Sequence, residues 1–257
     1  MFKPALIKVE QDGITYFTDP NLKTYGSKLF FTTRLGGFSL PPYAQLNLAF
    51  HVGDRAETVA KNWQTLAAKL NFNLKKTFLC EQVHSDKIKV VASKTKSWPN
   101  RAATADGLVT GEPGFTLAIL TADCVPIIFI DNQLKRVAAV HAGWRGTYEE
   151  IATKCLQKLV ELGSKKENIL AYLGPAIGGC CYQVPEERLL LFRKKFNLTK
   201  ENGLNLAKVN YKLLTDFGLK ADQICLTELC TACHREMFYS YRQQKTTGRQ
   251  AAIVGLL

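Results

Sequence analysis

The sequence predicts a mixed α/β fold built as one domain, and not a doubly wound parallel sheet. The 257 residues fit one large domain, and no repeat, low-complexity tract or long linker divides residues 1–257. Helix and strand patterns follow one another without strict alternation. Three strand patterns lie between Phe115 and His141 with no room for a helix, so we expect part of the sheet to be an antiparallel meander.

Four segments have the periodic apolar face and the end signals of helices. In the first segment, Asp54 and Glu57 make a start that resembles a capping box, and Thr147 is the expected cap of the second. Pro185 begins the third helix, and Gly218 follows the fourth. The expected helices cover residues 54–71, 147–162, 185–197 and 206–217.

Strands are expected wherever β-branched and aromatic residues form short apolar runs. Such runs occur between the helices as well as next to one another, which is why the sheet is expected to be mixed rather than parallel throughout. The expected strands cover residues 29–33, 77–82, 88–92, 115–121, 126–130, 136–141, 168–173 and 251–256.

The composition excludes several classes of protein. Hydrophobic residues make up 46% of the chain and charged residues 22%, which rules out disorder, a collagen-like repeat or a coiled coil as a description of the whole. The longest apolar stretch, residues 117–130, contains Asp123 and Pro126 and is shorter than the about 18 residues of a membrane helix. The first residues lack the apolar segment of a signal peptide, so we expect a cytoplasmic protein without a membrane partner.

The positive charge of the chain is spread out. There are 34 lysines and arginines against 22 acidic residues, a net charge of +12. Residues 75–101 and 188–220 are basic, but acidic residues interrupt both stretches, and neither contains a run of about five or six like charges. Because a clustered basic stripe is the usual mark of a nucleic-acid surface, we expect solvated surface and no nucleic-acid partner.

Three residues of metal-binding type stand at the ends of expected strands: His84, Cys124 and His141. The eight cysteines of a chain without an export signal are expected to be reduced thiols, available as ligands or nucleophiles. Three protein ligands with one open position are typical of catalytic zinc. Two histidines with one cysteine suit a blue-copper centre equally well.

The segment 138–147 has the features of an anion site. An apolar strand ends at His141, a turn containing Gly143 follows, and the next helix is expected to begin at Thr147. A helix N-terminus offers free N–H groups to an anion, and the guanidinium group of Arg145 suits phosphate. We therefore expect Arg145 and the start of this helix to bind a phosphate together.

The remaining cysteines match two known motifs only in part. Cys230, Cys233 and His234 spell a c-type haem attachment motif, but no export signal or suitable distal methionine accompanies it, so no haem is expected. His234 and Glu236 spell the H-x-E of nucleobase deaminases, but there the C-x-x-C follows the histidine rather than preceding it. Cys180 and Cys181 are adjacent in a glycine-rich loop, and the sequence allows either thiol to lie near a site.

Several motifs occur in an order that resembles a known family. They run QVH, ADG, TADC-P, VHAGWRG, GPAIG-CCY, LCT and FYSYR…TGR, from residue 82 to residue 249, with related segments near the N-terminus. Over nearly its whole length the chain thus resembles the multicopper polyphenol oxidase, or laccase-domain, family. Members of that family have been reassigned as purine nucleoside phosphorylases with adenosine deaminase activity.

The resemblance implies an α/β sandwich with partly antiparallel sheets and flanking helices, and it implies a site. The implied metal ligands are His84, Cys124 and His141, which leaves His51 and His234 outside the site. The implied catalytic residues are Cys124, His141 and Arg145. The residues expected to bind substrate or phosphate are Arg34, Asn47, Gln82, Gly143 and Arg145.

The implied function is a zinc-dependent reaction of purine nucleosides. It comprises phosphorolysis of adenosine and inosine, with guanosine and methylthioadenosine as further candidates, and deamination of adenosine. The expected partners are purine nucleosides and phosphate, and the expected state is a monomer or small homo-oligomer. Zinc lowers the pKa of water to about 7, which suits deamination.

Three alternatives use the same residues differently. A copper-dependent polyphenol oxidase is one, although four histidines are too few for the trinuclear cluster of a multicopper oxidase. A basic nucleic-acid-binding module with a structural metal is the second. The third is a cysteine hydrolase in which Cys124 is the nucleophile and His141 the base.

Overall fold

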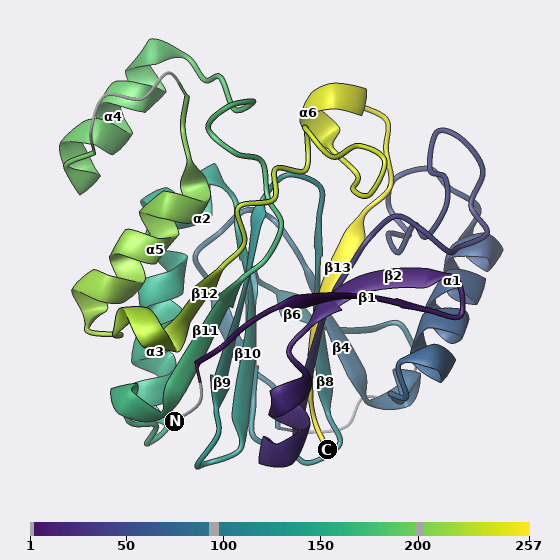
Figure 1. The fold of residues 1–257 in the computed structure, drawn as a ribbon, viewed down its shortest axis with the longest axis horizontal. Coiled ribbons are helices and arrows are strands. Elements are labelled where there is room, and N and C mark those ends of the chain that lie inside the picture. Colours follow the sequence, from purple (N-terminus) through teal and green to yellow (C-terminus); the bar gives the residue numbers. More distant parts are fainter. Residues whose placement is uncertain (1–2, 93–97, 199–202) are drawn as a thin grey trace.

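Two β-sheets packed face to face form the centre of the protein, with helices on their outer faces (Figure 1). We describe the fold from a computed structural model, which places residues 3–92, 98–198 and 203–257. The expected mixed α/β sandwich is confirmed. Lys94 and Lys96, part of the basic stretch 75–101, lie outside the described residues.

The first sheet has seven strands and is mixed. Strand β4 pairs in parallel with β8 and β6, and the other neighbours are antiparallel. Its order is β1 (Ile7–Gln11), β2 (Ile14–Thr18), β3 (Ser27–Thr32), β13 (Gln250–Leu256), β8 (Thr116–Thr121), β4 (Thr77–Glu81) and β6 (Asn100–Thr104).

The second sheet has six strands and is also mixed. The pairs β5–β7 and β11–β12 are parallel, and the others are antiparallel. Its order is β12 (Ile224–Leu226), β11 (Ile169–Leu173), β9 (Val125–Asp131), β10 (Arg136–Ala142), β7 (Gly107–Thr110) and β5 (Ile88–Val90).

Helices cover the two outer faces. Helix α1 (Ala56–Lys69) packs Val59, Trp63 and Leu66 on the seven-stranded sheet. The six-stranded sheet is covered mainly by α3 (Ile151–Glu161) and α5 (Leu206–Phe217). The remaining α-helices of the described residues are α2 (Trp144–Tyr148), α4 (Glu186–Phe196) and α6 (Tyr241–Gln244), and short 3-10 helices cover Pro20–Tyr25, Leu74–Lys76, Lys166–Asn168 and Ala221–Gln223.

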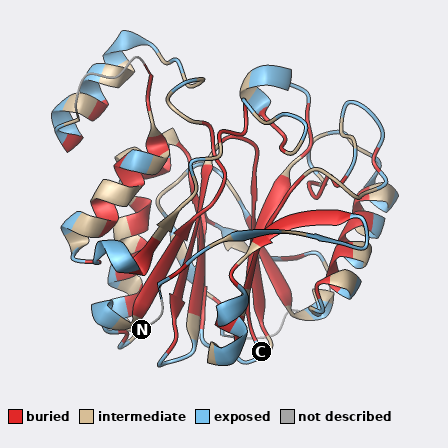
Figure 2. Cartoon of the chain, viewed as in Figure 1, coloured by how far each residue is buried: buried red, intermediate tan, exposed pale blue. Residues whose placement is uncertain are grey.

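The central strands are buried on both faces, as the red strands of Figure 2 show. Along β9, Val125, Ile127 and Phe129 face the helices, whereas Ile128 and Ile130 face the other sheet. This explains the continuous apolar run, because successive side chains of a strand point to opposite faces. No helix within the described ranges is long and apolar enough to cross a membrane.

Two helix predictions were wrong in detail. The segment 147–162 is not one helix, because Glu150 adopts a left-handed conformation (φ 60°) that separates α2 from α3. Helix α2 already begins at Trp144, and the hydroxyl of Thr147 accepts a hydrogen bond from Asn210 instead of capping a helix. Asp54 does not cap α1 either, since its carboxylate accepts the side-chain amide of Asn47.

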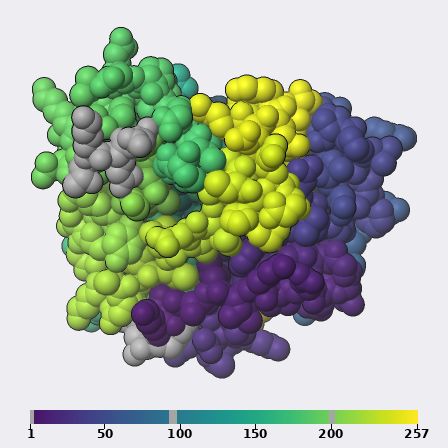
Figure 3. Space-filling view, turned by 45° about the horizontal axis from the view of Figure 1, so that its top comes forward, coloured from purple at the N-terminus to yellow at the C-terminus, as the bar shows by residue number. Residues whose placement is uncertain are grey.

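The expected meander is only partly present. Strands β9 and β10 form an antiparallel hairpin, but β8 belongs to the opposite sheet, so the chain crosses between sheets at residues 122–124. Figure 3 turns the top of the molecule in Figure 1 towards the viewer. There the C-terminal segment (yellow) lies between the green and blue parts of the chain.

Candidate metal centre and active site

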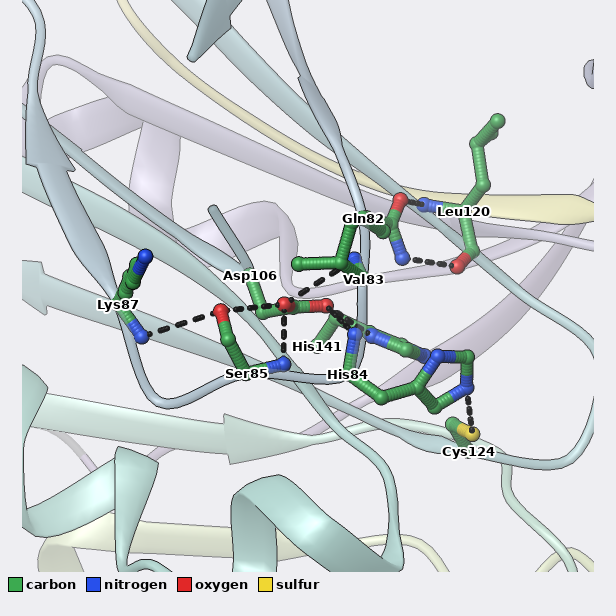
Figure 4. Close-up of polar contacts among 9 residues, drawn as sticks. All are labelled: Gln82, Val83, His84, Ser85, Lys87, Asp106, Leu120, Cys124 and His141. Carbon is green, nitrogen blue, oxygen red and sulfur yellow. Dashed lines mark hydrogen bonds and ion pairs between the residues drawn. The ribbon is translucent and has the colours of Figure 1, made fainter. Parts of the chain in front are cut away.

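The histidines and the cysteine expected to bind metal come together. His84 follows β4, Cys124 lies in the crossing between the sheets, and His141 is the penultimate residue of β10. Their ligand atoms all lie within 4.8 Å of one another. The Sγ of Cys124 is 3.9 Å from Nε2 of His84, and the two imidazole rings are 4.8 Å apart (Figure 4).

A buried carboxylate, Asp106, organises this trio. It accepts hydrogen bonds from the backbone N–H groups of Val83, His84 and Ser85, and from Nδ1 of His141 at 2.8 Å (Figure 4). The bond to His141 leaves Nε2 as the free ligand atom of that ring. Sequence reasoning assigned Asp106 no role of its own, although the Ala-Asp-Gly motif that contains it, at the start of β7, is part of the family resemblance.

Strained backbone holds two of the turns at the trio. His84 and Asp123 both have positive φ values, 61° and 96°, which non-glycine residues rarely adopt. Asp106 fixes the first turn through three N–H groups. At the second, Asp123 accepts the hydroxyl of Thr231 and the backbone N–H of Arg242. Such strain persists only where the surroundings over-determine it, and it concentrates at functional sites.

The charges in the trio depend on one another. Burial alone would raise the pKa of the Cys124 thiol, but the charge of His141 and hydrogen bonds from both histidines lower it to about 6. Burial would likewise lower the pKa of His141, but the Cys124 thiolate and Asp106 raise it to about 9. Burial also opposes ionisation of Asp106, yet its bonds with His141 and Ser85 hold that pKa at about 2.

The geometry of the trio fits a tetrahedral metal. With Zn–S bonds of about 2.3 Å and Zn–N bonds of about 2.0–2.1 Å, a sulfur and a nitrogen ligand lie about 3.6 Å apart. The separation between Cys124 and His84 is close to this value. Metal-bound histidines usually donate their second N–H to a carboxylate, as His141 does to Asp106. The donor set also suits copper.

Gly143 leaves room for these ligands. A Cβ atom at this position would lie 2.9 Å from Cδ2 of His84 and 3.2 Å from Sγ of Cys124. Real Cβ atoms essentially never approach within 3.0 Å, so a side chain here would force the ring of His84 to move, and Cys124 would have to shift slightly as well. Gly143, expected to bind substrate, therefore stands next to the trio.

A cavity of about 730 Å³ opens over the trio and is strongly basic. Arg145 lies on its wall, as expected, and the guanidinium groups of Arg145 and Arg188 both lie over the ring of Trp144, at 4.6 and 4.0 Å. Sequence reasoning missed the other cations of the wall. These are Arg188, Arg242, Lys245 and Arg249.

The N-terminus of the helix differs from the one expected to bind phosphate. Because α2 starts at Trp144, Arg145 lies inside the helix rather than before it, and α2 is only five residues long. The basic character of the cavity therefore comes from side chains on α2, α4 and α6 and near β13, not from a long helix pointing at the site.

Three further residues were expected to bind substrate or phosphate, and their surroundings differ from one another. Gln82 lines the cavity and exchanges two 2.8 Å hydrogen bonds with the backbone of Leu120, joining β4 to β8. Asn47 is buried, and its Oδ1 accepts the backbone N–H of Arg249. Arg34 does not line the cavity; its guanidinium donates to the carbonyl of Ala44 and stacks on a tyrosine ring. Their binding roles stay predictions.

The two remaining histidines lie outside the trio. His51 lines the same cavity, where desolvation and the charges of Arg249 and Arg101 lower its pKa and favour the neutral ring. Nδ1 of His234 lies 3.4 Å from the carboxylate of Glu236.

Together, the fold and the site define a class of protein: an α/β sandwich with an open His–Cys–His centre in a basic cavity. The chain belongs to the multi-copper polyphenol oxidoreductase laccase family, whose model matches residues 28–257. Two relatives are named purine nucleoside phosphorylases. YlmD of Bacillus subtilis is 32% identical over 88% of this chain and 87% of its own length, and YfiH of Escherichia coli is 36% identical over 88% and 92%.

Solved structures of the family have the same fold. The crystal structure of YlmD from Geobacillus stearothermophilus matches with a TM-score of 0.88 and 33% identity, covering 98% of this chain and 99% of that one. The structure of a hypothetical YfiH protein from Bacillus licheniformis gives the same TM-score at 32% identity, covering 96% of this chain and 98% of that one.

Proposed function

We propose that this protein is a purine nucleoside phosphorylase. It cleaves the bond between ribose and base in adenosine and inosine with inorganic phosphate, with guanosine and methylthioadenosine as further candidate substrates, and it also deaminates adenosine. The observation that carries the proposal is a single cavity in which a His–Cys–His centre stands beside several arginines. The names of the relatives support it.

The arginines of the cavity are suited to phosphate. Phosphate carries between one and two negative charges near neutral pH, and the planar guanidinium fork binds such oxygens in pairs. Arg242 and Arg249 belong to the C-terminal segment, and Arg145 and Arg188 lie beside Trp144. Asp123 is the only acidic residue among the described residues of the wall, and Thr231 and Arg242 already occupy its carboxylate.

The same cavity has apolar surface for a purine. Trp144, Ile177, Tyr182 and Leu206 line it together with the arginines and the trio. In phosphorolysis a phosphate oxygen bonds to C1′ of the ribose while the bond from C1′ to the base nitrogen breaks. The proton of the phosphate passes to the departing base, so the products are ribose 1-phosphate and the free base. The arginines hold the nucleophile in line for this displacement.

The trio would hold one zinc ion. His84, Cys124 and His141 supply three ligands, and Asp106 fixes the ring of His141 through Nδ1. A zinc ion with an open position supplies Lewis acidity towards a bound substrate or water. We place the enzyme in the cytoplasm, because all eight cysteines are free thiols and such a set suits a reducing compartment.

The test is a nucleoside assay with and without phosphate. Purified protein loaded with zinc is incubated with inosine, and hypoxanthine and ribose 1-phosphate are quantified. We expect both products in equal amounts and only when phosphate is present. Adenosine without phosphate should yield inosine and ammonia. Absence of both reactions in protein shown to contain zinc would refute the proposal.

Two specific observations favour other chemistry and define further outcomes. The His₂Cys donor set suits copper, so intense visible thiolate–copper absorption together with phenol oxidation would identify an oxidase. Asp106, His141 and Cys124 are also arranged like an acid–base–nucleophile triad. Hydrolytic activity that survives removal of metal and is lost on alkylation of Cys124 would identify a cysteine hydrolase.

A further inference from the structure

Four cysteines that the proposed reaction does not use come together away from the trio. They are Cys180, Cys181, Cys230 and Cys233, and their sulfur atoms all lie within 4.8 Å of one another. The sequence brings them from two loops about fifty residues apart. One is the glycine-rich loop after β11, and the other is the C-x-x-C turn after β12.

We propose that these four cysteines, here called the four-cysteine cluster, form a second metal site that binds one zinc ion. Four thiolates around a tetrahedral ion are a common structural zinc site, and a C-x-x-C pair is a typical half of one. On binding, the thiols that are protonated release their protons to solvent as the zinc–sulfur bonds form. The inference does not depend on the proposed reaction.

The distances match a shared ion rather than a covalent bond between sulfurs. Ligand sulfurs at about 2.3 Å from a tetrahedral ion stand about 3.8 Å apart. Cys233 Sγ lies 3.7 Å from Cys180 Sγ and 3.5 Å from Cys181 Sγ. A disulfide requires about 2.05 Å, and all four cysteines are free. The short separations also leave room for a single ion rather than a cluster of several irons.

The backbone around the four-cysteine cluster is shaped for sulfur. The N–H of Gly178 donates to Sγ of Cys230 at 3.2 Å, which stabilises negative charge on that sulfur. A Cβ atom at Gly178 would lie 3.2 Å from Sγ of Cys180 and 3.6 Å from Sγ of Cys230. The turn 178–182 is closed by hydrogen bonds from Cys181 and Tyr182 to the carbonyl of Gly178. The backbone of Gly178, which carries no side chain, therefore packs directly against these two sulfur atoms.

The turn that carries the C-x-x-C pair is also closed by backbone hydrogen bonds. The backbone N–H groups of Cys233 and His234 both donate to the carbonyl of Cys230, which brings the two sulfurs of the C-x-x-C pair to one side. An isolated bridge between Ala176 and Cys230 joins the two loops. The imidazole of His234 pairs with Glu236, so this residue of the apparent haem motif does not belong to the four-cysteine cluster.

The four-cysteine cluster supports the wall of the cavity. Ile177 and Thr231, one from each loop, donate hydrogen bonds to Asp123, the residue before Cys124. Tyr182 follows Cys181 directly and lines the cavity, where Arg242 lies over its ring. In Figure 3 the C-terminal segment lies directly against the green part of the chain. A zinc ion here would tie the two loops together and keep this wall in place.

Metal counting tests the inference directly. We expect zinc-grown wild-type protein to contain two zinc ions per chain. Cys124→Ala and the double variant C230S/C233S should each contain one, whereas the control Cys225→Ser should keep two, because Cys225 is half-buried and outside both groups. If C230S/C233S kept two ions, or the wild type held a single ion that Cys124→Ala removed, the inference would be refuted.

X-ray absorption at the zinc edge keeps the test valid if C230S/C233S does not fold. In Cys124→Ala the remaining zinc should have four sulfur neighbours at about 2.3 Å and no nitrogen neighbour. Mixed nitrogen and sulfur ligands would contradict the inference. So would a disulfide joining Cys233 to Cys180 or Cys181 in protein isolated anaerobically, because that pair would then be a redox couple.

Discussion

The carboxylate of Asp106 accepts Nδ1–H of His141 at 2.8 Å while also accepting the backbone N–H of His84. One fully buried side chain therefore positions two of the three expected metal ligands, which come from different sheets. The backbone N–H of His141 in turn donates to the carbonyl of Asp106, so the two residues are joined twice. This pairing fixes the ring that faces Cys124.

Replacing Asp106 with Asn should weaken metal binding. An amide does not carry the charge that favours N–H on Nδ1 of His141, and it turns an N–H group towards backbone donors that need an acceptor. Removing such a supporting carboxylate typically lowers metal affinity by about 10–100-fold. Chelator competition with zinc would measure it. Ser85→Ala, which removes one hydroxyl bond to Asp106, should stay near wild type.

Gly143→Ala should displace the ligands themselves. The added Cβ would stand 2.9 Å from the ring of His84, so zinc affinity and nucleoside turnover should each fall by about tenfold or more, equivalent to roughly 1.4 kcal/mol. Gly111→Ala is the matched control, because the nearest atom to its Cβ is 3.4 Å away on Arg136. Equal metal affinity in the two variants would show that the trio tolerates a side chain beside it.

Cys124→Ala should abolish activity while leaving the fold nearly intact. Its sulfur faces the cavity and the two histidines, so removing it deletes a ligand rather than core packing. Cys155→Ala should do the opposite and affect stability rather than activity. Because Cys155 is fully buried under β10, this variant should lose roughly 1 kcal/mol of stability with little change in rate. Thermal unfolding and nucleoside assays distinguish the two. Full turnover by Cys124→Ala would refute its role as a ligand.

Much of the fold could be predicted because its signals are local. The helix Leu206–Phe217 was predicted with its observed bounds, and Gly218 ends it in a left-handed conformation. The sequence did not predict the helix break at Glu150, because neither glycine nor proline marks it and the apolar period continues on both sides. The edge strand β1 was missed because its residues are mostly exposed and lack an apolar run.

The metal trio was predictable because histidines are few and because three residues of ligand type stand at strand ends. With four histidines in the chain, His84 and His141 stood out, and Cys124 joined them by its place at a strand end. Asp106 and Arg249 belong to common residue types, and only the fold brings Asp106 to His141, 35 residues away, and Arg249 to the wall of the cavity. The four-cysteine cluster was missed because each of its halves was assessed alone.

Arg145→Lys should lower the rate of phosphorolysis by about tenfold or more, and a tenfold change corresponds to about 1.4 kcal/mol of free energy. Lysine keeps the charge but loses the planar fork and the stacking on Trp144. Deamination, which needs no phosphate, should suffer less. The control is Arg55→Lys, an exposed residue at the start of α1 outside the cavity. Equal loss of both activities would instead assign Arg145 to the nucleoside or the loop.

The most direct test of the central claim follows ribose 1-phosphate. Zinc-loaded wild-type protein and Cys124→Ala are given inosine with phosphate, and ribose 1-phosphate is quantified against hypoxanthine. We expect equal amounts of the two products from the wild type, none without phosphate, and none from Cys124→Ala. Release of hypoxanthine with free ribose, or formation of ribose 1-phosphate by Cys124→Ala at the wild-type rate, would contradict a phosphorylase built on the His84, Cys124 and His141 centre.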